Sequence, residues 1–388
     1  MRNHQKYLFK PRGSNKLNVK VLTCFTFLMF MYDVNAAEFS SRAIVTTGTE
    51  YDSNPALSEN NKNPVWAYKI VPELQVDATS DINHWFLNSA LLIQRYSNGK
   101  VLVERQDPKF ILGWDRTYQS GIYGLKANYQ EATSRTLELT STGVFADKNG
   151  TQKTKSIEAM WQHSFNARWS ILNEGSYSIF DLSNAGGLGS YNLSELKSKI
   201  IFLNSEKLST YGQIIYTGYH PDSILNDTNL IRLAVGADYQ FNERLDIGVR
   251  GGIDKVSGNQ SETGWEGGIK SIYSPNEKSN YTADLSRTLG AGGIGGFQTV
   301  DSIKLTGNYN LSDKNIMGVN YQLNKSRQDS QINAISVDYQ QLELFYARVL
   351  SPHWEARFTG AHRELSSSNI NAQSNLVGVS VTYATLSF

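Results

Sequence analysis

Histidines are the first candidates for metal binding or acid–base catalysis, because imidazole titrates near neutral pH and is the commonest metal ligand. Five of them follow position 37, and they are far apart: His84, His163, His220, His353 and His362. A metal site needs ligands clustered at short spacing, and a serine hydrolase needs a nucleophile motif that this sequence lacks. We therefore expect solvated or interfacial histidines, with no metal, no cofactor and no catalytic residues. The chain is not expected to be an enzyme.

The N-terminal segment has the features of an export signal. Six basic residues precede the apolar run Val21–Tyr32, which is too short to span a membrane and is typical of a signal h-region. The small residues of Val34-Asn35-Ala36 predict cleavage after Ala36 or Ala37. The sequence therefore predicts a signal peptide at 1–36 and one mature domain at 37–388.

Charge and cysteine content narrow the class of the mature chain. Removing six basic residues and Asp33 with the signal leaves 31 basic and 35 acidic residues, a net charge of −4. A nucleic-acid-binding domain is typically basic, so that class is excluded. The one cysteine, Cys24, leaves with the signal, and the mean hydropathy of −0.40 excludes a set of apolar membrane helices. A bacterial envelope protein stabilised by a hydrogen-bonded sheet fits these facts.

Almost the whole mature chain alternates polar and apolar residues with a period of two, as a strand with one apolar face does. In 245–254, Leu245, Ile247, Val249 and Ile253 alternate with charged or small residues. The segment 231–241 repeats this pattern and is joined to the first by a short polar turn. The two segments therefore predict a β-hairpin.

Similar short turns recur at intervals of about 35 to 45 residues, which fits two strands and one longer loop. Eight such turns are Ser80–Asn83, Gln119–Gly121, Asn166–Arg168, Asn204–Lys207, Asn242–Arg244, Pro275–Ser279, Ser312–Asn315 and Ser351–His353. Nine longer loops are centred near Ser58, Lys100, Phe145, Gly187, Asp222, Gly258, Gly293, Gln328 and Ser368. Seventeen connections predict an all-β, antiparallel up-and-down barrel of 18 strands, with 16 as the alternative. Short turns would be periplasmic and long loops extracellular.

Alternation alone does not distinguish a soluble barrel from a transmembrane one, so the position of the aromatic residues decides. Aromatic residues gather at membrane interfaces, and one end of a membrane barrel should carry a belt of them. Ten lie beside the short turns: Trp85, Tyr118, Tyr123, Phe165, Trp169, Phe241, Tyr273, Tyr281, Tyr309 and Trp354. We therefore predict an integral outer-membrane barrel of a Gram-negative bacterium, although aromatic residues also favour strand ends generally.

The C-terminal aromatic Phe388 resembles the insertion signal of such barrels. Ala384 and Leu386 share its parity, whereas Val377 and Tyr383 have the opposite parity. Either a bulge intervenes or the signal is weak.

Charged residues at the parity opposite to the apolar ones are predicted to line a water-filled lumen. These pore-lining candidates are Lys69, Glu73, Asp77, Lys126, Arg232, Asp238, Asp246, Arg250, Asp254, Glu266, Lys270, Asp284, Lys304, Glu355, Arg357 and Arg363. A strongly ion-selective channel carries a ring of one sign, but here both signs are mixed. The lining suits neutral or weakly charged polar cargo, or forms only a hydrated wall. An 18-strand barrel leaves an aqueous channel unless a loop plugs it.

The glycine-rich stretch Leu289–Gly296 superficially resembles a phosphate-binding loop. It lacks the Lys-Ser/Thr pair and the following helix that such a loop needs. We expect a mobile external loop between two strands, with folding into the pore mouth as the alternative.

The segment Tyr51, Asp52, Ser53, Asn54 and Pro55, together with the hairpin series and Phe388, resembles the β-barrel porins found with bacterial exopolysaccharide and capsule export systems. The architecture matches over the mature chain, but the motif covers only these residues. The resemblance implies an outer-membrane conduit for a secreted polysaccharide. From the residues themselves, Asp52, Asn54 and Pro55 are expected to end the first strand and shape a loop.

Two classes of function remain open at this point. The first is a porin-like conduit, for export of an exopolysaccharide or for general or solute-specific diffusion; the second is a structural or assembly barrel with a closed lumen. The expected partners are outer-membrane lipid and lipopolysaccharide, the barrel-assembly machinery, a separate periplasmic polysaccharide-export protein and the polysaccharide. Nucleic acid is not an expected partner.

Overall fold

The computed structural model describes residues 38–386 except 61, 135–138, 140–149, 223–226, 259–261, 294, 329–334 and 368–369. The expected signal peptide, Cys24 and Phe388 lie outside the described residues. Among those described, no helix is long and apolar enough to cross a membrane.

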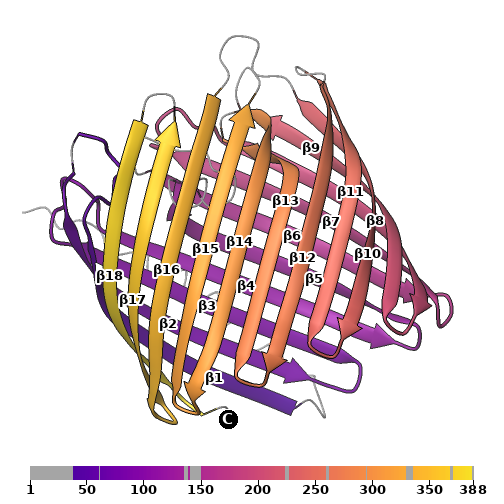
Figure 1. The fold of residues 1–388 in the computed structure, drawn as a ribbon, viewed down its shortest axis with the longest axis horizontal. Coiled ribbons are helices and arrows are strands. Elements are labelled where there is room, and N and C mark those ends of the chain that lie inside the picture. The colour runs from indigo at the N-terminus through magenta and orange to yellow at the C-terminus, as the bar shows by residue number, and fades with distance from the viewer. Residues whose placement is uncertain are drawn as a thin grey trace, which may run out of the picture.

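The chain forms one closed antiparallel barrel (Figure 1). Its strands are β1 (Glu38–Asp52), β2 (Val65–Thr79), β3 (Asn83–Tyr96), β4 (Arg105–Tyr118), β5 (Gly121–Thr133), β6 (Thr151–Ser164), β7 (Trp169–Ser183), β8 (Tyr191–Ser205), β9 (Leu208–Pro221), β10 (Thr228–Asn242), β11 (Leu245–Gly258), β12 (Glu262–Asn276), β13 (Ser279–Gly292), β14 (Gly296–Ser312), β15 (Asn315–Gln328), β16 (Ile335–Ser351), β17 (Trp354–Ser367) and β18 (Ile370–Ala384). Each pairs with its sequence neighbours, and β1 closes the ring against β18. The predicted count of 18 strands and all eight short turns are confirmed.

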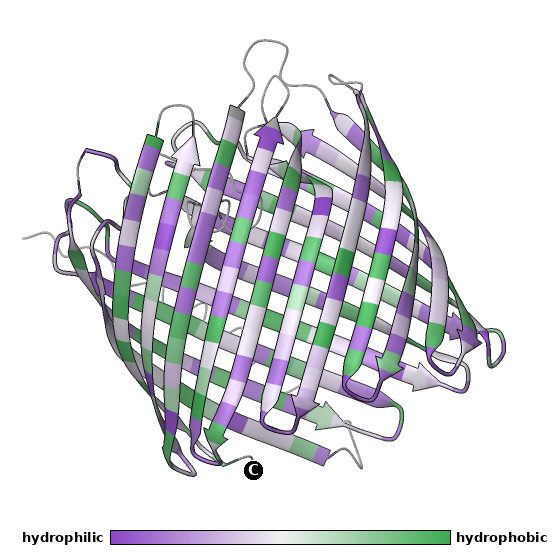
Figure 2. Cartoon of the chain, viewed as in Figure 1, coloured by the Kyte–Doolittle hydropathy of each residue, from purple (hydrophilic) through white to green (hydrophobic). Residues whose placement is uncertain are grey.

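The alternation places apolar residues on the outside of the barrel. On β11, Val249 and Ile253 are 45% and 59% exposed, and on β10 Leu233 and Val235 are exposed beside them. Figure 2 shows the resulting alternation of hydrophobic and hydrophilic residues along the strands. A large apolar surface on the outside, with charged residues on the inside, is the arrangement of a membrane barrel and the inverse of a soluble one.

The aromatic belt lies beside the short turns. Seven of the ten predicted belt residues are exposed there: Phe165, Trp169, Phe241, Tyr273, Tyr281, Tyr309 and Trp354. Trp85 and Tyr123 pack against Trp114, with ring centroids 5.4 and 5.5 Å apart. The last strand ends at Ala384, and its pairing with β17 has no bulge. Leu386 therefore lies beyond the strand.

Candidate functional site in the barrel interior

The charged residues predicted for the lumen all lie at the inward parity of their strands, opposite to the exposed apolar residues. Several are neutralised across neighbouring strands: Lys69 lies 2.7 Å from Glu50, Lys126 lies 3.0 Å from Glu158, and Arg357 lies 3.7 Å from Glu343. Arg250, Lys270 and Lys304 form no ion pair with a described residue, and Asp284 lies opposite both lysines in the register. The inner wall therefore carries both signs, and half of the predicted residues form ion pairs with described residues. That these residues line a conducting pore remains a prediction.

Three of these candidates do not face open space. Arg232 Nε lies 2.7 Å from Asp254 and 2.9 Å from Glu266, and Asp254 and Glu266 are 0% and 3% exposed. One oxygen of each carboxylate, Asp254 Oδ2 and Glu266 Oε1, is buried without a partner. Two buried carboxylates thus share one guanidinium, and an incompletely paired buried charge is costly. The expectation of solvated lumen positions is wrong for these residues, because a hairpin covers them.

The covering element is the tip of the β13–β14 hairpin. Its residues Leu289, Ala291 and Phe297 pack against an apolar cluster on the inner wall that contains Tyr219 and Leu230. Other members of this cluster are Tyr191, Val256, Phe180, Leu182 and Leu193. The expectation of a mobile external loop at Leu289–Gly296 is therefore wrong. Most of the stretch is strand, and it is held inside the barrel.

Three hydrogen bonds hold the hairpin tip against the wall. The Tyr219 hydroxyl donates to the Gly292 carbonyl (3.3 Å), Arg232 Nη2 donates to the Leu289 carbonyl (3.3 Å), and the Gly189 amide donates to the Gly293 carbonyl (2.8 Å). These donors come from β9, β10 and the β7–β8 connection. The tip therefore lies across the inner face of several strands.

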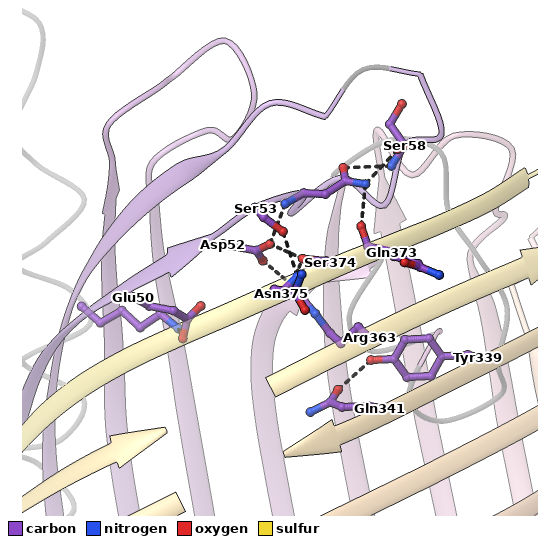
Figure 3. Close-up of polar contacts among 12 residues, drawn as sticks. Glu50, Asp52, Ser53, Ser58, Tyr339, Gln341, Arg363, Gln373, Ser374 and Asn375 are labelled. Carbon is purple, nitrogen blue, oxygen red and sulfur yellow. Dashed lines mark hydrogen bonds and ion pairs between the residues drawn. The ribbon is translucent and has the colours of Figure 1, made fainter. Parts of the chain in front are cut away.

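The five-residue motif anchors the start of the β1–β2 loop against β17 and β18 (Figure 3). The Asp52 carboxylate accepts hydrogen bonds from Arg363 on β17 and Ser374 on β18. Asn54 is 1% exposed; its amide donates to the Ser58 carbonyl (2.8 Å) and its Oδ1 accepts from the Ser58 amide (3.1 Å). Strand β1 ends at Asp52 as expected, and the motif has a structural role in folding its loop.

A second inward apolar contact is made by Leu139. Leu139 lies between β5 and β6, yet it packs in a cluster with Leu57 from the β1–β2 loop and with Tyr339 and Leu365 on β16 and β17. Asn324 Nδ2 on β15 also lies 3.5 Å from the Leu139 carbonyl. Strand β15 stands nine positions from β6 in the ring of 18. Leu139 therefore lies against the wall opposite β6.

A hollow of about 380 Å³ lies along the inner wall of β1, β2 and β16–β18. Its polar lining includes the pairs Glu50–Lys69 and Glu343–Arg357, and its small residues include Gly48. Because the charged groups are paired, the hollow offers hydrogen-bond donors and acceptors with little net charge. Such a surface suits polar solutes without selecting strongly for one sign.

Sequence reasoning missed both inward apolar clusters. The cluster residues that belong to the barrel wall have the inward parity of their strands, close to the long loops, as Tyr219, Leu230, Val256, Tyr339 and Leu365 illustrate. Apolar residues at inward positions of a predicted barrel were the available signal. They indicate that loops fold in and cover the wall.

Comparisons with known proteins identify the fold. No protein-family model matches the sequence, and no curated protein matches it significantly. Among solved structures, the outer membrane protein OpdK from Pseudomonas aeruginosa is similar over 90% of this chain and 99% of its own, with 10% identity and a TM-score of 0.50. Its structure with vanillate gives the same values. The siderophore receptor PirA from the same organism has 9% identity and a TM-score of 0.45, over 89% of this chain and 80% of its own.

Identities this low establish a shared fold. The fold is that of the integral outer-membrane β-barrels of Gram-negative bacteria, as the sequence predicted.

Proposed function

We propose that this chain is an integral outer-membrane channel that conducts small hydrated polar solutes. The supporting observation is the inner wall, where charged residues of both signs replace the apolar residues that a filled soluble barrel would carry inside. The proposal is for transport without catalysis. The membrane partners are outer-membrane lipid and lipopolysaccharide, with insertion by the barrel-assembly machinery.

The size of the ring and the inward loops support small cargo. Eighteen strands spaced and tilted as in known barrels give a backbone diameter of roughly 35 Å. Leu139 and the β13–β14 tip occupy part of that space on different sides of the barrel. The remaining passage is narrower than the bare barrel, which favours solutes over folded macromolecules.

Conductance in a planar lipid bilayer tests this proposal. The purified refolded protein should produce stepwise ionic currents, with weak preference between K⁺ and Cl⁻ because the wall carries both signs. A protein that inserts fully, shown by heat-modifiable migration on a gel, but gives no current would instead be a structural or assembly barrel with a closed lumen.

Export of an exopolysaccharide is the second candidate, and the resemblance at Tyr51–Pro55 favours it. A cell that makes the polymer but lacks this chain should retain it in the periplasm, because a hydrated polymer does not cross hydrocarbon. Such export would also require a separate periplasmic export protein. Normal surface polymer with slower uptake of a solute in the deletion strain would favour the diffusion channel and reject export.

A further inference from the structure

We propose that the β13–β14 hairpin is a movable gate that is closed in this structure. The gate opens when the end of β13 pairs with residues 262–266 of β12, which have no partner on β13 here. The inference rests on the proposed channel function. The pairing of β12 with β13 ends at Gly267 opposite Arg287, whereas the pairing of β13 with β14 continues to Gly292 opposite Gly296. The hairpin tip is therefore an intact two-stranded unit that leaves the wall (Figure 1).

Because the tip leaves the wall, one segment of β12 has no partner on the β13 side. Strand β12 pairs with β11 up to Glu262 opposite Val256, so residues 262–266 stay in the wall with no partner on β13. Continuing the register from Gly267 and Arg287 sets Trp265 opposite Leu289. Unpaired edge groups of a sheet are sites for strand addition, so this edge can receive β13.

The apolar residues of the tip fit both positions. Leu289 and Ala291 have the outward parity of β13, shared with Tyr281 and Leu285, which are exposed on the barrel surface. In the structure they pack inward instead, against the cluster that contains Leu230. In the returned position they would lie outside beside Trp265, which is 58% exposed. The same side chains thus have an apolar environment in each state, as an element with two stable positions requires.

The closed position is held by groups that the open position would release. Arg232 Nη2 on β10 and the Tyr219 hydroxyl on β9 donate to carbonyls of the tip. The register of β13 with β12 ends at Arg287, whose guanidinium lies 4.5 Å from the centre of the Trp265 ring. Withdrawal of the tip would also uncover the buried Asp254 and Glu266, whose unpartnered oxygens could then be hydrated. Opening would therefore expose these two carboxylates to water, which can satisfy their hydrogen bonds, and it would widen the lumen.

Disulfide trapping tests the gate in a background without competing thiols, because no cysteine follows Cys24. The test pair is Trp265→Cys with Leu289→Cys. These positions face opposite sides of the wall here and become direct neighbours only in the open state. The control pair is Ile269→Cys with Leu285→Cys, which are already opposite each other on the same two strands and the same face. Both pairs are oxidised in the folded protein and scored by gel shift and by single-channel recording.

We expect both pairs to cross-link, and only the Trp265/Leu289 disulfide to raise the single-channel conductance, with reversal on reduction. Cross-linking of the control pair alone overturns the gate, and so does an open-trapped channel whose conductance equals that of its reduced form. If neither double-cysteine variant conducts ions, oxidised or reduced, the proposed channel function is wrong. Cross-linking at Trp265/Leu289 would in that case still show that the hairpin moves. The two failures are therefore distinguishable.

Discussion

Val249→Arg tests the assignment of the two barrel faces directly. Val249 lies on the outside of β11 with 45% of its surface exposed, and its register partners are Ala237 on β10 and Ile269 on β12. An arginine at this position would direct its guanidinium into hydrocarbon with no carboxylate among these neighbours. Arg250, one residue further, has the inward parity and no described ion-pair partner.

The expected energies differ widely. Arginine facing lipid near the midplane of a barrel costs about 2–4 kcal/mol, which lowers the folding equilibrium constant roughly 30- to 800-fold. Replacing the exposed, unpaired Arg250 by valine should change stability by about 0.5 kcal/mol or less. The Val249 substitution should therefore prevent stable insertion, and the Arg250 substitution should be mild.

Folding into lipid vesicles at a series of urea concentrations, scored by heat-modifiable gel migration, measures both variants. Val249→Leu is the matched control, because it changes the side chain without placing a charge in the membrane. Equal damage from Val249→Arg and Arg250→Val, or the reverse order, would refute the face assignment and with it the predicted lumen.

Three further predictions concern the interior. Arg363→Met leaves the buried Asp52 carboxylate without its cation and should lower folding stability by about 3 kcal/mol; an unchanged urea midpoint would mean that solvent already screens the pair. Arg250→Glu combined with Arg357→Glu should shift the reversal potential in a KCl gradient toward cation selectivity, and an unchanged potential would place both residues outside the ion path. Leu139→Ala removes packing worth about 2 kcal/mol or more and should weaken the contact of residue 139 with β16 and β17, which single-channel recording would detect as a larger or noisier conductance.

The architecture could be predicted from the sequence because a strand has a strict two-residue period. A shift by one residue would turn every apolar side chain from lipid to water, so the pattern around Val249 fixes both the face and the register. The turn at Asn242–Arg244 is equally local, since polar residues interrupt two alternating segments. Strand number and face thus follow from features that lie close together in the chain.

The interior could be predicted only in part, because its shape depends on contacts between distant segments. Leu57, Leu139 and Leu365 form one cluster although they come from three separate parts of the chain. Neither the spacing nor the composition of the loops indicates which wall each loop reaches. The inward parity of these charged residues could therefore be predicted, whereas the burial of Asp254 and Glu266 could not.

Leu289 shows why local pattern and global packing can disagree within one strand. Its parity assigns it to the lipid face. From Ser279 to Arg287 the strand pairs with β12, and residues of this parity, such as Leu285, are exposed on the outside. After Arg287 the strand no longer pairs with β12, and Leu289 packs inside the barrel against the apolar cluster that contains Leu230. Burial of an apolar side chain is non-directional, so it stabilises either placement, and the choice depends on which backbone groups remain paired. A departure from alternation at such a branch point therefore indicates where a barrel wall can rearrange.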